Sequence, residues 1–224
     1  NGLGAGSPAR HVIRGANYAR LDGFTITGGV ATSLDNYPYQ AAGGGMLNLS
    51  VSPTVANCIF TGNTAGFGAG MGNVSDAAPS VLNCRFLQNN APEIPGAPDG
   101  LGIGGGMGNA YNAAPRVLNC SFEENTAENF GGGMYSFDGS TPTLDACKFL
   151  NNSSGAFGGA FFGYLNVSAT VINSEFYGNA SNTGGAIDFE GNCTLNLNNC
   201  VFAGNTATTA AGGISLYSSG ATLL

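Results

Sequence analysis

The chain has 224 residues, of which only 8% are charged, and its 13 acidic against 6 basic residues give a formal net charge of −7. This balance leaves no basic stripe for phosphate backbones, and it disfavours nucleic acids and anionic membrane surfaces as partners. No apolar run reaches the roughly 18 residues of a membrane span, and the first ten residues do not resemble a signal peptide. The 38 glycines are unusual for a compact globular enzyme.

The chain repeats itself. Phrases such as NCIFTGN and NCVFAGN place phenylalanine at successive spacings of 26, 36, 27, 27 and 26 residues. Glycine-rich phrases such as GGGM and GGAI mark a second column, which contains all four methionines. The two columns are Phe60, Phe86, Phe122, Phe149, Phe176 and Phe202, with Phe24 of LDGFTITGG assigned to the same position, and Met46, Met71, Met107, Met134, Phe161, Ile187 and Ile214.

Each unit reads, in chain order, as a strand at the methionine column, a strand that begins just after a proline in four of the units, and a strand at the phenylalanine column. Apolar residues alternate in these short strands, so each column points to one side. The glycines before the methionine column are interpreted as bends and close-approach positions. The proline-led strand contributes a third apolar column, which is Val55, Val81, Val117, Leu144, Val171 and Leu197.

A unit of 26 residues cannot bury its apolar side alone, but stacked copies can. Equal positions then lie about 4.8 Å apart in neighbouring coils, and each strand pairs in parallel with its copies. The sequence therefore predicts an all-β fold, a right-handed parallel β-helix solenoid of about seven to eight coils of 26–27 residues. A helical solenoid is disfavoured because no segment shows a 3.6-residue period, and a β-sandwich does not explain the fixed repeat.

The pairing of GGA[ILV] with FxxN, present here as GGAI (184–187), GGAF (158–161), FTGN, FYGN and FAGN, resembles the repeats of the polymorphic outer membrane protein group. It also resembles the wider set of secreted bacterial β-helix repeat proteins. The resemblance covers nearly the whole chain from about Leu21. It implies a large surface or secreted protein, often an adhesin-like passenger, and it indicates a location better than an activity.

Five of the six cysteines form a column two residues before the phenylalanines, and Cys193 stands outside it. Zinc is disfavoured because there is no CxxC pair and His11 is the only histidine. Neighbouring cysteines in the column are within disulfide reach, but packing as small apolar side chains is the simpler interpretation. Asparagines beside them are expected to occupy left-handed bends and to stack as an amide ladder. The cysteines are Cys58, Cys84, Cys120, Cys147 and Cys200, and the asparagines are Asn57, Asn83, Asn119, Asn173 and Asn199.

Function is expected on the outward positions that flank the methionine column. In the first three coils these positions hold only glycine and aliphatic residues, whereas the last four coils place aromatic residues around two carboxylates on one strand face. Exposed aromatics gathered on a strand face mark a ligand or partner site, unless a neighbouring segment covers them or they only stabilise the sheet. Stacking on sugar rings is one suitable role. The candidate ligand-binding residues are Tyr135, Phe137, Phe162, Tyr164, Asp188, Glu190 and Tyr217.

Two insertions, 30–41 and 91–101, leave the same corner of the solenoid two coils apart. Insertions in repeat proteins commonly map to one functional side. They form a second contact patch, a weak calcium site or, as the simpler interpretation, solvated loops without a binding role. Calcium is the one cofactor considered, and no metal is otherwise expected. The residues of this loop patch are Asp35, Tyr37, Tyr39, Glu93 and Asp99.

Catalysis is the alternative function. A polysaccharide lyase or glycoside hydrolase could use Asp188 and Glu190, which are two residues apart on one strand. Against it, the columns place no third acid beside them, and no lysine or arginine projects from that strand in any coil.

The chain is interpreted as one β-helix domain over residues 1–224, either a fragment of a longer surface protein or an open-ended unit whose ends meet another chain. The expected function is a non-catalytic, extracellular or cell-surface bacterial module for display, adhesion or binding. Its expected partners are a carbohydrate or protein ligand on the aromatic face and a further copy at its ends. Nucleic acid and membrane insertion are not expected.

Overall fold

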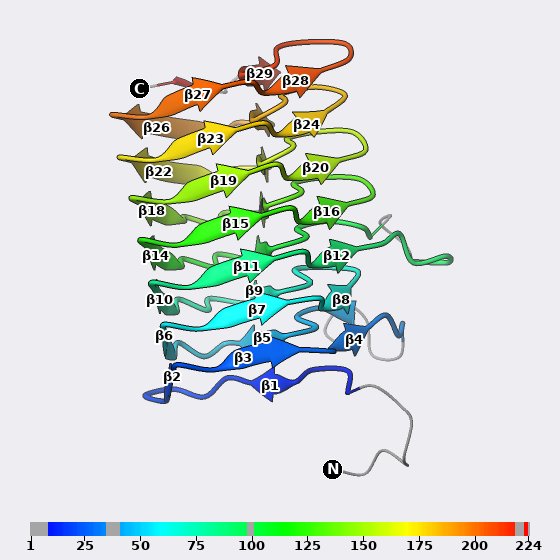
Figure 1. The fold of residues 1–224 in the computed structure, drawn as a ribbon, viewed down its shortest axis with the longest axis vertical. Coiled ribbons are helices and arrows are strands. Elements are labelled where there is room, and N and C mark those ends of the chain that lie inside the picture. Colours follow the sequence, from blue (N-terminus) through cyan, green and yellow to red (C-terminus); the bar gives the residue numbers. More distant parts are fainter. Residues whose placement is uncertain (1–8, 35–40, 98–100, 218–221, 224) are drawn as a thin grey trace.

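A computed structural model describes residues 9–34, 41–97, 101–217 and 222–223. All of its named elements are strands, which stack coil upon coil into the long parallel β-helix shown in Figure 1. In the described part of the chain, no helix has the length and apolar character needed to cross a membrane. The four sheets contain seven or eight strands each, and every pairing is parallel, which confirms the predicted architecture and number of coils.

Each coil supplies one strand to each of four sheets, which we call sheets A to D in the order in which the chain meets them. Sheet A contains the methionine column, and its strands are β1 (Ile13–Arg14), β5 (Met46–Leu49), β9 (Met71–Val74), β13 (Met107–Ala110), β17 (Met134–Phe137), β21 (Phe161–Tyr164), β25 (Ile187–Glu190) and β29 (Ile214–Tyr217). Sheet B contains the valine column, and its strands are β2 (Arg20–Asp22), β6 (Thr54–Ala56), β10 (Ser80–Leu82), β14 (Arg116–Leu118), β18 (Thr143–Asp145), β22 (Ser168–Ile172), β26 (Thr194–Asn198) and β30 (Thr222–Leu223).

Sheet C contains the phenylalanine column, and sheet D consists of two-residue strands at the next corner. Sheet C is formed by β3 (Thr25–Thr27), β7 (Ile59–Thr61), β11 (Arg85–Leu87), β15 (Ser121–Glu123), β19 (Lys148–Leu150), β23 (Glu175–Tyr177) and β27 (Val201–Ala203). Sheet D is formed by β4 (Val30–Ala31), β8 (Thr64–Ala65), β12 (Asn90–Ala91), β16 (Thr126–Ala127), β20 (Ser153–Ser154), β24 (Ala180–Ser181) and β28 (Thr206–Ala207).

The predicted columns face the core. Phenylalanine rings of neighbouring coils stack with centroids 4.7–4.9 Å apart and planes within 6° of parallel. The methionine and valine columns pair in register, and their side chains join the same apolar cluster. Glycine is required beside them. Gly131 has a φ of 64°, and a Cβ on Gly133 would lie 2.7 Å from the Ala160 carbonyl oxygen and 2.9 Å from the Phe149 ring.

The placement of Phe24 in the phenylalanine column is wrong. Ile26 pairs with Phe60 and is 1% exposed, whereas Phe24 is 57% exposed. Phe24 instead lies opposite Cys58, and its backbone N–H donates to the Cys58 Sγ. The parallel pairing of β3 with β7 fixes the register: it sets Ile26 opposite Phe60 in the core and leaves Phe24, which precedes β3, at the position of Cys58.

A second asparagine ladder, formed by the last residue of each FxxN phrase, is buried inside the corner between sheets C and D. The Asn125 side-chain amide donates to the Phe86 carbonyl at 2.9 Å and to Asn152 Oδ1 at 3.0 Å, and its own Oδ1 accepts two N–H groups of Asn89. Each amide therefore satisfies buried backbone groups of the previous coil and the amide of the next. The members are Asn63, Asn89, Asn125, Asn152, Asn179 and Asn205.

The exposed asparagine ladder predicted beside the cysteines is confirmed. Its members have positive φ, and Asn119 Nδ2 donates to Asn83 Oδ1 at 2.9 Å. The cysteines are free thiols, and those of the column stack in the core as the simpler interpretation predicts. Cys193 lies outside the column but is also buried in the core.

The buried ladder can be tested by substitution. We expect Asn125→Ala to lower the free energy of unfolding by about 3 kcal/mol, because the Phe86 carbonyl and two Asn89 donors lose a buried partner. Asn119→Gly is the matched control, since it removes one exposed ladder bond and keeps the backbone at positive φ, and should cost less than about 1 kcal/mol. Urea unfolding followed by circular dichroism measures both. Equal losses would contradict this account of the buried ladder.

The thiols can be tested by alkylation. Burial raises the pKa of the Cys147 thiol to about 12, and Cys147 has no exposed surface. We therefore expect native protein at pH 8 to leave Cys147 and Cys193 unlabelled by iodoacetamide, while the half-buried Cys200 reacts. Peptide mapping after labelling identifies each site, with labelling in urea as the control. A cysteine that stays unlabelled in urea until a reductant is added would reveal a disulfide.

Candidate functional site

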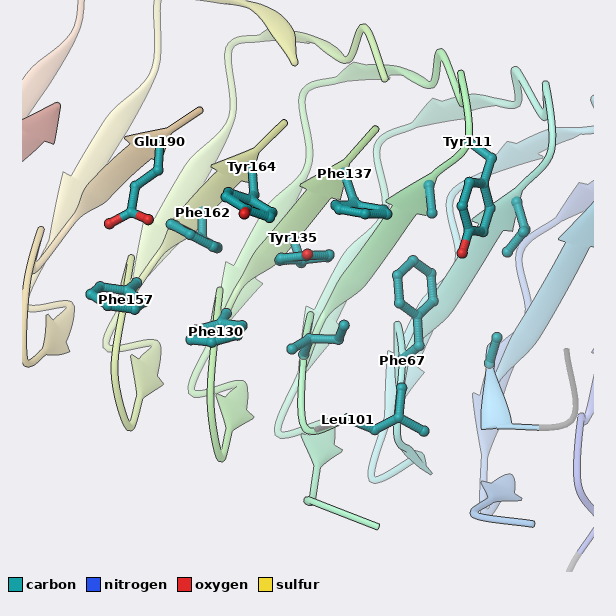
Figure 2. A pocket seen from close by; sticks show the side chains of 14 residues that line it. Phe67, Leu101, Tyr111, Phe130, Tyr135, Phe137, Phe157, Phe162, Tyr164 and Glu190 are labelled. Carbon is teal, nitrogen blue, oxygen red and sulfur yellow. The ribbon is translucent and has the colours of Figure 1, made fainter. Parts of the chain in front are cut away.

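The outer face of sheet A holds a groove that runs along the stack of coils. Its volume is about 480 Å³, and Figure 2 shows its side chains. We call it the aromatic groove. The residues that line it are Ala42, Phe67, Val74, Leu101, Ile103, Ala110, Tyr111, Phe130, Tyr135, Phe137, Phe157, Phe162, Tyr164 and Glu190.

The floor of the groove comes from the outward positions of sheet A. Gly108, Tyr135 and Phe162 pair in register on β13, β17 and β21, and Phe137 pairs with Tyr164. The sequence prediction that these aromatics gather on one strand face is confirmed. Because Gly108 has no side chain, the space beside it on β13 is taken by the Phe67 ring, and the rings that belong to the floor itself begin at β17.

One wall of the groove was not predicted from the sequence. It is built by the residue that precedes each glycine-rich phrase, and these residues pair from coil to coil as isolated parallel bridges. A Cβ on Gly108 would lie 2.6 Å from the Phe67 ring, so the glycine makes room for this wall. The signal was available, since this residue always lies four positions before the methionine column. We call these residues the bridge column; they are Ala42, Phe67, Ile103, Phe130, Phe157 and Thr183, and the first five line the groove.

The rings of the groove stack mainly on one another. Centroids are 5.8 Å apart for Tyr135 and Phe162, 5.9 Å for Phe137 and Tyr164, and 5.4 Å for Phe130 and Phe157, with planes 18–32° apart. Figure 2 shows these rings in successive layers. The rings of the β17 coil and those of the β21 coil therefore contact each other through their faces, and mostly their edges point into the groove.

This packing corrects the picture of an exposed aromatic platform. Tyr135 and Phe162 are only 5% and 3% exposed, because the bridge column closes over them. Phe137 is half-buried and Tyr164 is 41% exposed. Tyr217 is 70% exposed on β29 and does not line the groove.

Both insertions leave the corner that follows sheet D, as predicted, after β4 and β12. Three described apolar residues of the insertions are not solvated: Ile94 and Leu101 belong to the apolar cluster of the groove, and Leu34 packs against it. Gly66 accommodates them, since a Cβ there would lie 2.6 Å from Ile94 Cδ1 and 2.7 Å from Leu101 Cδ1. Glu93, a residue of the predicted loop patch, forms a hydrogen bond through its backbone: its N–H donates to the Glu128 carboxylate at 2.9 Å.

The rest of the predicted loop patch, Asp35, Tyr37, Tyr39 and Asp99, lies outside the described residues. Within the described part of the chain, no group of three or more histidine, cysteine, aspartate or glutamate side chains could hold a metal ion. The calcium site considered from the sequence therefore stays a prediction.

The two candidate carboxylates occupy different environments. Asp188 is 1% exposed, its Oδ2 accepts the Thr183 hydroxyl at 2.5 Å, and its Oδ1 has no hydrogen-bond partner among the described residues. Burial raises the pKa of Asp188, while the hydrogen bonds from Thr183 and Ser215 oppose that shift. Glu190 lies at the groove, and its pKa is raised by burial and by the charge of Asp188. The structure thus brings Glu190, and not Asp188, to the groove surface.

Asp188 should make stability depend on pH. A carboxyl group whose pKa is raised on folding resists ionisation in the folded state, so its contribution to stability falls as pH rises from its ordinary pKa of 3.8 through the raised value. Because asparagine does not ionise, we expect Asp188→Asn to increase the free energy of unfolding relative to wild type, and this increase should grow from about pH 3.5 to about pH 7 when the salt concentration is held constant. Urea unfolding at a series of pH values measures it. Glu175→Gln, which removes a carboxylate paired with Lys148 at 3.1 Å, should give no such gain. A gain independent of pH would contradict the raised pKa.

Comparison with known proteins places the fold in a family. The family model of the right-handed β-helix region matches residues 99–224, more than half of the chain, including the ring layers of β17 and β21. No curated protein and no solved structure matches the chain. With its parallel sheets and in-register columns, the chain belongs to the right-handed β-helix family.

Proposed function

We propose that this protein is a non-catalytic binding module that captures a partner protein in the aromatic groove. We further propose that it works outside the cell, as a secreted or surface-displayed bacterial β-helix of the polymorphic outer membrane protein kind. The GGA[ILV] and FxxN phrases and the low content of charge support that setting. An adhesin-like role would follow from display of the groove on the long side of the solenoid.

The observation that carries this proposal is the aromatic groove itself. Its volume of about 480 Å³ lies within the range of ligand pockets, and thirteen of its fourteen lining residues are apolar or aromatic. Release of water from such a groove lowers the free energy when an apolar partner enters. Solenoids commonly use a long surface of this kind for binding.

The ring geometry favours a protein partner over a carbohydrate. A sugar ring stacks on the free face of an aromatic ring, but the facing sides of Tyr135 and Phe162, and of Phe137 and Tyr164, are occupied by each other. Ring edges and aliphatic side chains such as Val74 and Ile103 instead suit apolar side chains.

The burial of Asp188 also favours binding over catalysis. A glycoside hydrolase places two carboxyl groups against the scissile bond, and in this structure Asp188 is 1% exposed. Only Glu190 lines the groove.

The groove can be tested with a neutral apolar dye. We expect Nile red to bind the wild-type protein with enhanced fluorescence, and Ala110→Trp to weaken that binding at least about tenfold, because the indole fills the groove beside Tyr111 and Phe137. Fluorescence titration measures the affinity. Ala203→Trp, on the exposed outer side of sheet C, is the matched control and should leave binding unchanged.

A glycan array separates the two partner classes. Wild type and Tyr164→Ala should both fail to retain glycans if the partner is a protein. Retention that Tyr164→Ala abolishes would replace the protein partner by a carbohydrate, and Nile red binding that Ala110→Trp leaves intact would overturn the groove as the site.

A further inference from the structure

The stack of groove rings ends at β21. Toward the preceding coil, the rings of Phe157, Phe162 and Tyr164 each face another ring. Toward the following coil they face positions without rings: the partners there are Thr183, Asp188 and Glu190. The outer faces of the last ring layer are therefore turned toward the coil that carries both carboxylates.

Figure 2 shows the consequence at the end of the groove. The Glu190 carboxylate lies beside the rings of Phe162 and Tyr164, with Phe157 on the side of the bridge column. Ring faces carry negative electrostatic potential, as does a carboxylate, and the two attract the same kind of ligand group. That group is a cation with an apolar stem.

Among the described residues, none that lines the groove carries a positive charge. Lysine, arginine and histidine are absent from the residues that line the groove, and the ion pairs formed between described residues lie on sheets B and C. Asp188, buried behind Glu190, keeps one oxygen without a hydrogen-bond partner among the described residues. Two acidic groups two residues apart on β25 thus face an aromatic surface without a compensating charge, which a bound cation would provide.

The length of the groove indicates what carries the cation. From β5 to β25 the groove crosses five coil-to-coil steps of about 4.8 Å, which is about 24 Å. An extended polypeptide of about seven residues spans this distance, and alternation turns every second side chain toward the floor. The net charge of −7 would also favour the approach of a basic partner.

We propose that the aromatic groove binds an extended polypeptide segment whose apolar side chains lie along its floor and whose lysine or arginine side chain lies against Glu190 and the outer face of Tyr164, the exposed ring of the last layer. This inference rests on the proposed protein-binding function and adds the chemistry and the orientation of the partner. The apolar residues enter toward Phe67 and Ile103, and the cation is held at the β25 end.

Three matched peptides test it. Each is an acetylated and amidated heptapeptide with leucine at the first, third and fifth positions, threonine between them, and lysine, glutamine or glutamate at the seventh. Isothermal titration calorimetry with the full chain should give about tenfold tighter binding of the lysine peptide than of the glutamine peptide, and the weakest binding for glutamate. Glu190→Gln should bring the lysine and glutamine peptides within about twofold of each other.

Controls separate this inference from the proposed function. Glu175→Gln, which removes a carboxylate of sheet C, should keep the preference for lysine. If Ala110→Trp abolishes binding of all three peptides but wild type shows no preference, the cation site is wrong while the groove remains a protein-binding site. A preference that survives Glu190→Gln, butylammonium binding as tight as the lysine peptide, or no binding of any peptide would each overturn the proposal.

Discussion

The structure depends on one constraint: each residue packs against its own counterpart in the next coil. Parallel in-register pairing places equal positions about 4.8 Å apart, so a column of identical residues is favourable only where the side chain is stabilised by its own copies. Phenylalanine rings meet this condition by stacking at 4.7–4.9 Å, and asparagine amides meet it by donating to one neighbour and accepting from the other. A charged column would not, because like charges at this spacing repel. The low charge content of the chain follows from this geometry.

The same constraint makes every departure from the repeat informative. On the first outward position of sheet A the side chain changes from none at Gly108, to rings at Tyr135 and Phe162, to a carboxylate at Asp188. Register forces these unlike groups into contact along one line. A glycine, a ring stack and an acidic end therefore follow one another over four coils, and this order gives the groove a direction that a perfect repeat would lack.

The core could be predicted from the sequence because its signal is periodic. The methionine, valine and phenylalanine columns recur at a nearly constant spacing, and the strands pair as that spacing requires. Phe24 was misplaced because the assignment followed residue type, whereas the pairing of β3 with β7 sets Ile26 opposite Phe60. The first coil has no cysteine to anchor the alignment, so residue type alone was a poor guide there.

The site was predictable in its residues and not in its burial. Outward alternation identified Tyr135 and Phe162. The bridge column that covers them lies at a corner of the coil, where neither a two-residue period nor an apolar run in the sequence indicates a contact. The bridge column recurs with the coils, yet its members vary from Ala42 through Phe67 to Thr183, so the pattern is one of position and not of residue type. Long-range packing of this column and of the second insertion turns an exposed sheet face into a groove.

The two carboxyl groups at the end of the groove, Asp188 and Glu190, destabilise the folded state when they are ionised, and no basic residue among those that line the groove compensates for them. Burial raises the pKa of both Asp188 and Glu190, and the Asp188 charge adds to the shift at Glu190, so each is less easily ionised here than in water. Elsewhere in the described chain the acids of sheet C have basic neighbours, as in the pairs of Arg85 with Glu123 and Lys148 with Glu175. Sheet C thus pairs its charges, whereas β25 of sheet A carries two acids beside the ring stack without a basic neighbour among the described residues. The unfavourable electrostatic free energy of the fold is therefore concentrated at this end of the groove. A cationic partner would recover that free energy, which makes the β25 end of the groove the place where binding strength and selectivity coincide.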